Sequence, residues 1–475
     1  MNLEPVIGLE IHVEMKTKSK MFSSSPVTFN APHNSSVTPY DLAFPGTMPV
    51  VNKQAIINGI RMSHALHMEI DDTLYFDRKN YFYSDLPKGF QITQQRRPIG
   101  KNGYVEIKTP EGIRKIGIER LHLEEDTCKQ LHFIDYTLLD YNRAGVPLAE
   151  IVSRPEIKNG YEAMKYVEAI RNIAIYTETS DGKMEEGSLR CDVNISLKPY
   201  GTRVFGTKVE IKNLNSLKNI QEAIDYEIVR QSKVLLSGGK VQQETRRFDE
   251  SKGQTILMRV KTDAVDYKYF CEPNITPIKL GQAFIDDAVN SCPELYDDKF
   301  KRYLTLGLNE KDCEIILNNR DMARYFENAV GEMKNAKGLA NLLITEINAY
   351  LNKQGITITS LTLKPEILRE IVLMGEKESL SHKQVTDILD EVLKSGITPK
   401  EAKEKLHIVP QISDASSLLP LVTQVLDNNP QSIIDFKNGK DRAIGFLIGQ
   451  VMKLSKGKAN AAMVSKLMNE ELRKR

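Results

Sequence analysis

The stretch that most constrains the fold is residues 188–197, SLRCDVNISL, in which polar and apolar side chains alternate strictly. A period of two over such a run predicts a half-buried β-strand. Its apolar side, beginning at Leu189, is suited to a core. Its polar side carries Arg190, Asp192 and Asn194, which could bind phosphate and a cation. The same row could equally be a polar edge of a large sheet, and this stretch alone leaves both interpretations open.

A second alternating stretch, residues 6–16, places Glu10 and His12 on one side. Residues two apart on a strand point to the same face, so this pair could share a divalent ion. A solvated face of an ordinary amphipathic strand is the alternative. Further acids occur at residues 122–126, HLEED, where adjacent carboxylates repel unless a cation or an arginine lies between them. An AGVP turn separates Arg143 from Glu150 and could bring these two residues to one rim.

The chain changes character along its 475 residues, a length that predicts about three domains. Strand-like alternation and Gly/Pro turns dominate up to about residue 290, and helical, Lys/Glu-rich sequence follows. Breaks in the pattern predict three domains, at residues 1–292, 293–406 and 407–475. Apolar periodicity and Gly or Ser breaks predict helices at about residues 50–68, 217–237, 340–353 and 366–376.

Composition and motifs exclude several classes of protein. The five cysteines show no CxxC pair, so we expect free thiols in a reducing compartment. We expect neither a signal peptide nor a membrane helix, and therefore a cytoplasmic protein. A net charge of +2 means that any surface for nucleic acid must be local. Neither GxxxxGK[ST] nor GxGxxG occurs, so we expect no P-loop and no dinucleotide fold.

Eight motifs occur in a fixed order over almost the whole chain: VIGLEIHVE, FDRKNYFYSDLPKGFQI, HLEED, LDYNRAGVPLAEIVSRPEI, DGKMEEGSLRCDVNIS, VEIKNLNS, QETRRFDE and DYKYF. Together they closely resemble the B-subunit family of aspartyl/glutamyl-tRNA amidotransferases. The resemblance implies an α+β chain. A cradle domain with an antiparallel sheet, of glutamine synthetase-like fold, would precede an all-helical domain and a small helical tail domain.

The resemblance also implies an activity. Proteins of this family use ATP and Mg²⁺ to phosphorylate the side-chain carboxylate of Glu on tRNA-Gln or of Asp on tRNA-Asn. Ammonia then displaces the phosphate and leaves the amide. The implied partners are an amidase (glutaminase) subunit that frees ammonia from glutamine, a small third subunit, and the mischarged tRNA. The sequence does not tell which of the two tRNAs is used in the cell.

Site residues follow from the resemblance, motif by motif. It implies a magnesium site made of Glu10, His12, Glu125 and Glu150. It implies catalytic roles for Glu10, Glu125, Arg190 and Asp192. Lys79, in the FDRKNY motif, and Arg190 are the expected contacts to phosphate. A carboxylate that attacks a γ-phosphate needs cations to neutralise both groups, which agrees with this composition.

The chain departs from the family pattern in its first loop, where many members carry CxC and CxxC for zinc. The aligned positions here are Ser23, Ser25, Thr38 and Asp41. Oxygen groups of this kind do not form a tetrahedral thiolate site, so we expect no structural zinc. The usual YFPEP motif is YFCEP, which places the free thiol of Cys271 at that turn. Near the C-terminus KGKANP becomes KGKANA, so the turn after Asn460 lacks its proline.

Basic residues gather in the tail, within residues 437–458, against the single acid Asp441. They are Lys437, Lys440, Arg442, Lys453, Lys456 and Lys458. A solvated helix face is the simple explanation. Because the family's tail domain contacts tRNA, we expect an RNA-binding patch here.

Two rival functions belong to other classes. One is a tRNA-binding scaffold without catalysis, which the joint presence of Glu10, His12, Glu125, Glu150 and Asp192 opposes. The other is a metal-dependent phosphotransferase that acts on small molecules, which the basic tail opposes. Titration with metal would test the first, and activity on free glutamate would support the second.

Overall fold

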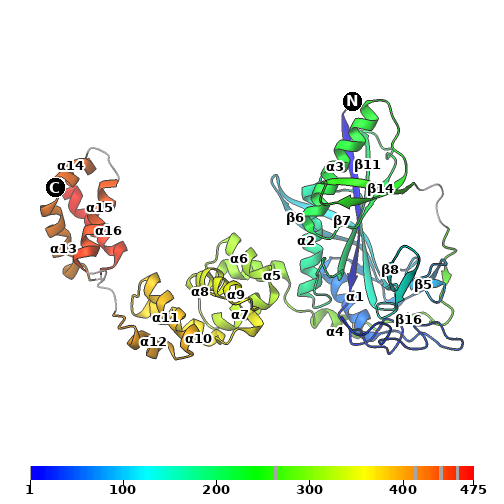
Figure 1. Ribbon diagram of the computed structural model, residues 1–475, viewed down its shortest axis with the longest axis horizontal. Helices are drawn as coiled ribbons and strands as arrows, with labels where there is room; N and C mark the ends of the chain where they lie inside the picture. The colour runs from blue at the N-terminus through cyan, green and yellow to red at the C-terminus, as the bar shows by residue number, and fades with distance from the viewer. Residues whose placement is uncertain (1, 261–265, 410–413, 438–441, 456–458, 475) are drawn as a thin grey trace. The chain divides into compact units, whose positions relative to one another are not determined.

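The structure is a computed structural model that describes residues 2–260, 266–409, 414–437, 442–455 and 459–474 (Figure 1). Contacts between Cα atoms divide the chain into two compact units, Met1–Asp298 and Lys299–Arg475. The predicted boundary at 292/293 falls a few residues before this division. The predicted boundary at 406/407 falls inside the second unit and stays a prediction.

The first unit is built on one nine-stranded sheet, with the order β14-β13-β12-β11-β1-β10-β7-β6-β2. Its pairs are antiparallel except for β12 with β13, which are parallel. The strands are β1 (Leu3–Glu14), β2 (Glu69–Ile70), β6 (Gly100–Thr109), β7 (Gly112–Glu125), β10 (Pro147–Ser153), β11 (Leu189–Pro199), β12 (Val209–Lys212), β13 (Glu244–Asp249) and β14 (Gln254–Val260).

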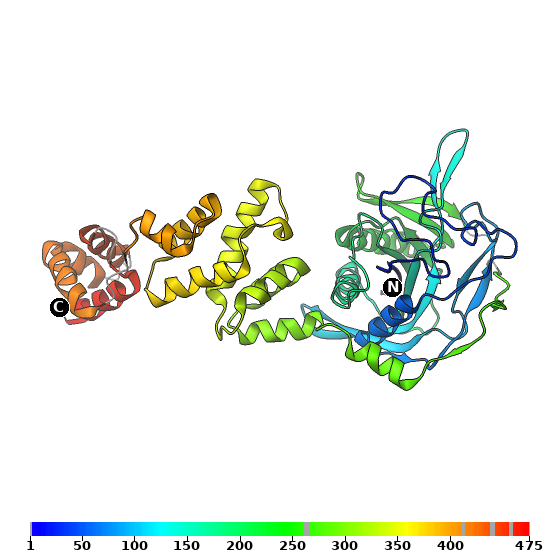
Figure 2. The ribbon, with the colours of Figure 1, turned by 90° about the horizontal axis from the view of Figure 1, so that it is seen from below.

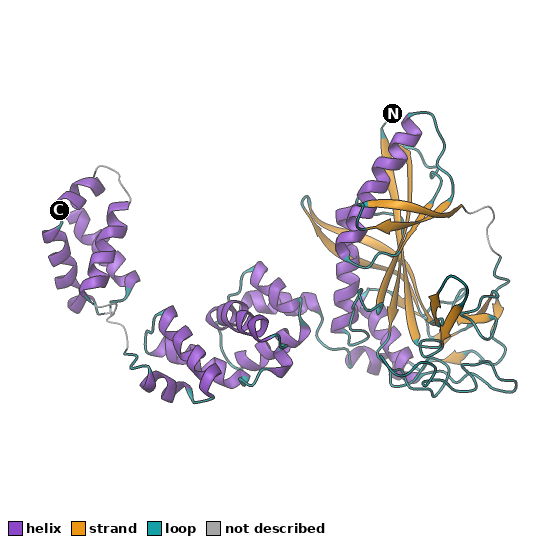
Figure 3. Ribbon diagram, viewed as in Figure 1, coloured by secondary structure: helices purple, strands orange, loops and turns teal. Residues whose placement is uncertain are grey.

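Both alternating stretches are strands, as predicted, and they are neighbours in the centre of this sheet. Their apolar sides share one buried core with α2 (Gly160–Tyr176) and α3 (Leu217–Leu236). Figures 1 and 3 show these two helices along one side of the sheet. The core thus covers one face and leaves the polar rows on the other.

Local sequence accounts for the helices that cover the core. Asn52, Asn159 and Ser216 each cap a helix by accepting hydrogen bonds from backbone N–H groups of its first turn. The first and third of these helices, α1 (Lys53–Ala65) and α3, were predicted, whereas α2 was not. Figure 2 shows α1 beside α4 (Gln282–Asn290), with which it packs.

Short strands pair outside the large sheet. They form three small sheets from β4 (Asp77–Asn80), β5 (Phe90–Thr93) and β15 (Phe270–Cys271), from β3 (Thr73–Leu74) and β16 (Ile278–Lys279), and from β8 (Lys129–His132) and β9 (Thr137–Asp140). β5 packs against β7, so it forms one wall beside the polar rows.

The second unit is helical in its described residues. Its helices are α5 (Tyr296–Thr305), which begins in the first unit, α6 (Glu310–Leu317), α7 (Arg320–Val330), α8 (Lys337–Leu342), η1 (Leu343–Ile347), α9 (Asn348–Gln354), η2 (Ile358–Ser360), α10 (Pro365–Lys377), α11 (His382–Ser395), α12 (Pro399–Lys405), α13 (Ala415–Asn428), α14 (Pro430–Lys437), α15 (Arg442–Leu454) and α16 (Ala461–Lys474). The predicted helix at 340–353 corresponds to α8, a π-helical turn and α9. The one at 366–376 is α10. Helices α13–α16 enclose a core of their own.

The predicted fold class is confirmed at the level of a mixed chain with a large, mainly antiparallel sheet followed by helices. All five cysteines are unpaired, as expected. In the part of the chain that the structure describes, no helix has both the length and the apolar character needed to cross a membrane.

Candidate active site

Four polar side chains form one row across the centre of the sheet. In the strand registers, His122 of β7 lies opposite Glu150 of β10, Glu150 lies opposite His12 of β1, and His12 lies opposite Arg190 of β11. Side chains directly opposite one another on neighbouring strands are close enough to interact. Strand pairing therefore collects residues that are far apart in the sequence.

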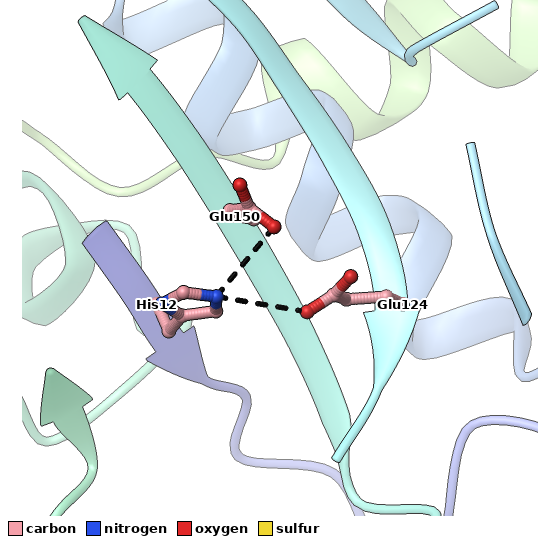
Figure 4. Close-up of side chains that lie close together, drawn as sticks. All are labelled: His12, Glu124 and Glu150. Atoms are coloured by element: carbon pink, nitrogen blue, oxygen red, sulfur yellow. Dashed lines mark ion pairs between the residues drawn. The ribbon is translucent and has the colours of Figure 1, made fainter. Parts of the chain in front are cut away.

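The row and the adjoining Glu124 contain a candidate metal site (Figure 4). Ligand atoms of His12, Glu124 and Glu150 all lie within 4.8 Å of one another. His12 Nε2 is 3.5 Å from Glu150 Oε2 and 3.8 Å from Glu124 Oε1. Two carboxylates and one imidazole from three strands could enclose a single cation.

Burial and mutual contact shift the proton equilibria of this cluster. Burial lowers the pKa of His12, but its contact with Glu150 outweighs burial and the pKa is raised. Burial opposes the raised pKa of His122 too, yet the charge of Glu150 and the contact with Glu124 bring it to about 9. Burial raises the pKa of Glu150, but His122 and His12 hold it well below its usual range. The two imidazoles and the Glu150 carboxylate thus stabilise one another's charged forms.

Two of the predicted metal ligands have other partners in this structure. Both carboxylate oxygens of Glu125 accept from Lys88 Nζ at 2.6 Å, and Oε1 also accepts from the backbone N–H of Ile92. Glu10 Oε1 accepts from Asn194 Nδ2 at 2.8 Å. The compact cluster therefore shares His12 and Glu150 with the predicted set, and it contains Glu124 instead of Glu10 or Glu125.

The predicted residues of β11 lie at the edge of the cluster. Arg190 Nη2 donates to Asp126 Oδ2 at 2.7 Å, while its Nε is buried without an acceptor among the described residues. Burial lowers the pKa of Arg190, but Asp126 outweighs burial and raises it, so the guanidinium stays charged. Asp192 accepts from Lys212 Nζ at 2.5 Å. Arg190 therefore retains a donor for a further anion.

Lys79 lies on β4, in the small sheet formed by β15, β4 and β5, and approaches the cluster from there. Its Nζ lies 4.9 Å from the centre of the Tyr267 ring, a cation–π distance. Burial lowers the pKa of Lys79, but the negative charges of Glu124 and Glu150 contribute to raising it overall. Lys79, the predicted phosphate contact, is thus half-buried, and its surroundings favour the charged ammonium form.

Several residues at the site were missed as functional groups by sequence reasoning. Glu124 and His122 stood in the quoted HLEED motif, but the motif does not tell which of two adjacent glutamates faces His12. Glu14 follows His12 by two residues on β1, so alternation alone puts it on the same face. Burial and the neighbouring Asp126 raise the pKa of Glu14 to about 8. Glu14 therefore adds a carboxyl beside the row, in surroundings that favour its protonated form.

Hydrogen bonds connect residues at the four positions of the first loop that were considered for zinc, Ser23, Ser25, Thr38 and Asp41. Asp41 accepts from the Ser23 hydroxyl at 2.8 Å and from the backbone and hydroxyl of Thr38 at 2.8 and 2.9 Å. Lys20 Nζ, on a completely buried side chain, lies 3.6 Å from Asp41 Oδ2. Ser25 is buried nearby in the chain. The four positions that were considered for zinc thus carry oxygen groups, and the carboxylate among them has a lysine partner.

The predicted basic patch of the tail is described only in part. Lys437 belongs to α14, and Arg442 and Lys453 are exposed on α15. Lys440, Lys456 and Lys458 lie outside the described residues, as does Asp441. The patch stays a prediction.

Comparison with known proteins gives matches over most of the chain. Residues 5–286 match the family described as "GatB/GatE catalytic domain", and residues 324–472 match the "GatB domain" family. A relative from Bacillus licheniformis, named as the B subunit of aspartyl/glutamyl-tRNA(Asn/Gln) amidotransferase, is 50% identical over 478 residues. One with the same name from Lysinibacillus sphaericus is 48% identical over 476 residues. Both alignments cover 100% of each chain.

Proposed function

The chain belongs to the family of aspartyl/glutamyl-tRNA amidotransferase B subunits, and on that premise we propose that it converts mischarged tRNA into the correct aminoacyl-tRNA. It would use ATP to phosphorylate the side-chain carboxylate of Glu on tRNA-Gln, of Asp on tRNA-Asn, or of both. It would then direct ammonia from the partner amidase to the activated carbon. The observation that supports this most is the cluster of His12, Glu124 and Glu150 beside Arg190 and Lys79.

We propose that Mg²⁺ is held by His12, Glu124 and Glu150. Mg²⁺ is normally bound through one or two carboxylates and keeps several waters, and this donor set leaves positions for water and phosphate oxygens. When bound, the ion would neutralise charge on the phosphate oxygens. Glu10 and Glu125 remain proposed members of the wider site.

The cationic side chains suit the first step, in which a carboxylate oxygen bonds to the γ-phosphorus and ADP leaves. Arg190 has a buried N–H without an acceptor among the described residues, and Lys79 keeps its charge beside Glu124 and Glu150. Each could neutralise a phosphate oxygen as the two anions approach. In the second step ammonia nitrogen bonds to the acyl carbon, phosphate leaves, and a proton must be lost. Asp192, held by Lys212, is the proposed acceptor through water.

We propose further features that the resemblance implies. The sheet of the first unit would have a glutamine synthetase-like fold. The tail would form a domain of its own that binds tRNA. The partners would be the amidase subunit and the small third subunit. Unpaired thiols support a cytoplasmic location.

The test of the function is reconstitution. The chain is mixed with both partner subunits, ATP, Mg²⁺, glutamine and each mischarged tRNA, and the amino acid on the tRNA is identified. We expect the amide to form only with ATP, and ammonium to replace both glutamine and the amidase. Amide formation at an undiminished rate without ATP would contradict the proposal, as would release of ammonia from glutamine by the single chain.

Replacing each of two adjacent glutamates, Glu124 and Glu125, tests which of them binds the metal ion. We expect Glu124→Gln to weaken metal binding strongly, because Glu124 belongs to the cluster. We expect Glu125→Gln to affect metal affinity less, because Lys88 and Ile92 engage that carboxylate. Titration of both full-length variants with Mn²⁺ gives the comparison. The reverse order of affinities would restore Glu125 as the ligand.

A further inference from the structure

His122 lies behind the proposed metal site and takes no part in the chemistry described above. It points to the same face of β7 as Glu124, two residues further along the strand, and lies opposite Glu150 on β10. Its side chain is only 5% exposed, whereas that of His12 is 22% exposed. The two imidazoles therefore occupy the buried and the open end of one cluster.

The contacts of His122 link the two carboxylates. Its Nε2 lies 3.0 Å from Glu150 Oε2 and 3.5 Å from Glu124 Oε2. The Glu124 oxygen nearest His12 is the other one, Oε1. The hydroxyl of Thr93 donates to Oε2 as well, at 3.3 Å. Glu124 thus has one oxygen held from behind and one directed toward the proposed ion.

The proposed ligand set is His12, Glu124 and Glu150, whose ligand atoms lie within 4.8 Å of one another. His122 is distinguished from His12 by its deeper burial, on the far side of the two carboxylates from solvent. Metal-binding side chains are commonly oriented by hydrogen bonds from a second layer of residues, whose loss weakens metal binding roughly 10- to 100-fold. Two carboxylates at diagonal positions on neighbouring strands also repel unless a positive or donor group lies between them.

We infer that His122 is a positioning residue, which bridges Glu124 and Glu150 from the buried side and keeps them at the spacing that a divalent ion requires. This inference rests on the proposed function for the identity of the site. It assigns His122 no contact with the ion, the nucleotide or the tRNA. His122 acts by positioning the two glutamates, so its replacement should change the affinity for the metal ion.

The first test measures metal binding by the full-length chain, with Mn²⁺ as the probe and electron paramagnetic resonance as the readout. His122→Leu removes the donor and keeps an apolar side chain of similar bulk, while His122→Gln keeps an N–H donor at a similar reach. We expect a Kd about 10- to 100-fold higher for His122→Leu and a Kd close to the unaltered chain for His122→Gln. His64→Leu, on the exposed side of α1, is the matched control and should not change the Kd.

The second test measures amidation by the assembled enzyme. We expect His122→Leu to raise the Mg²⁺ concentration needed for half-maximal rate and to leave kcat largely intact at saturating Mg²⁺. Glu150→Gln, which removes a ligand, should not be rescued in this way. A kcat that stays low at saturating Mg²⁺, with an unchanged Kd for Mn²⁺, would overturn the inference and make His122 a catalytic residue.

Other outcomes are equally decisive. A Kd for His122→Leu equal to that of the unaltered chain would overturn the inference, as would a folded His122→Gln that binds as weakly as His122→Leu. A chain that binds no Mn²⁺ would overturn it as well.

If His122→Leu does not fold, His122→Asn replaces it, because the shorter amide does not reach both carboxylates. It should bind Mn²⁺ more weakly than His122→Gln, and equal affinities would count against the inference.

The two proposals can fail separately. If the assembled enzyme forms no amide but Mn²⁺ affinity still depends on His122, the proposed function falls and the positioning role stands. If amide forms normally and Mn²⁺ affinity is indifferent to His122, only the positioning role falls.

Discussion

At the scale of single residues, Glu227 of α3 is a fully buried acid that lies outside the candidate active site. Its carboxylate has several partners. Its Oε1 accepts from Arg230 Nη2 at 2.5 Å and from Gln231 at 3.0 Å, and its Oε2 accepts from the Thr255 hydroxyl at 2.9 Å. Arg246 Nε lies 3.7 Å from Oε2. One carboxylate thereby joins a helix to two strands near the edge of the sheet.

This network predicts how stability depends on pH. Burial raises the pKa of Glu227, but the bonds from Arg230 and Gln231 outweigh it and lower that pKa below 4.5. A lowered pKa means that the carboxylate contributes stability above pH 4.5, and that this contribution is lost as the pH falls through the folded-state value. We expect Glu227→Gln to reduce the free energy of unfolding by about 3 kcal/mol at pH 7.

Denaturant unfolding of both chains between pH 7 and pH 3 measures this difference. It should shrink as the pH falls below 4.5, because Glu227 of the unfolded chain then takes up a proton, and it should be smallest below the lower folded-state pKa. A difference that stays constant over this range would show that the charge of Glu227 contributes nothing.

At the scale of elements, α2 and α3 approach closely where α2 begins. A Cβ added at Gly160 would lie 2.4 Å from the backbone oxygen of Gln221 and 2.7 Å from Asp225 Oδ1. The Gly160 N–H donates to that same Asp225 oxygen at 3.1 Å. A glycine therefore permits both the contact and the hydrogen bond.

Gly160→Ala should push these helices apart. We expect it to destabilise the first unit by about 1–3 kcal/mol, because a backbone atom has to move. Gly445→Ala is the contrasting control, since α15 has open space around Gly445 and alanine is the better helix former by roughly 1 kcal/mol. Thermal unfolding followed by circular dichroism should show a lower midpoint for the first variant only. A neutral Gly160→Ala would mean that the helices adjust freely.

The first loop gives a second prediction for an element. A buried ion pair between Lys20 and Asp41 holds this loop, together with Ser23 and Thr38. We expect less than one equivalent of zinc per purified chain by elemental analysis, and no change in unfolding when a chelator is added. Asp41→Asn should destabilise the chain by about 3 kcal/mol, because it leaves the Lys20 ammonium buried without its counter-charge. Stoichiometric zinc would refute this account of the loop.

At the scale of the whole molecule, chemistry and tRNA affinity are assigned to separate parts of the chain. The cluster and its cationic neighbours belong to the first unit, whereas the predicted basic patch lies at the far end of the sequence. α13–α16 enclose a separate core, which allows the tail to be removed with little effect on other cores.

Deleting residues 408–475 should raise KM for the aminoacyl-tRNA and lower kcat much less. Phosphate contacts release counterions, so each lost contact should reduce the salt slope by roughly 0.7–0.9. Replacing only Arg442 and Lys453 by Gln tests charge without deleting the tail, since both are exposed on α15. Steady-state kinetics of the full assembly at two salt concentrations gives both constants. An unchanged KM, or a rate lost at saturating tRNA, would exclude this role for the tail.

The sequence alone determined the strands and their faces, because alternation is a local property. Arg190, Asp192 and Asn194 had to share a face once residues 188–197 formed a strand, and His12 had to share one with Glu10. Motif order also identified the family, which the comparisons confirm.

Only the tertiary structure decided which residues meet. Register is set by pairing between distant strands, and a shift of one position reverses every side chain. This pairing put His122, Glu150, His12 and Arg190 in one row. Contacts with other segments then gave the adjacent residues Glu124 and Glu125 different partners. Lys88 binds the carboxylate of Glu125, whereas that of Glu124 lies beside His12. Neither the register nor these partners leaves a local signal in the sequence, since both depend on contacts between segments far apart along the chain.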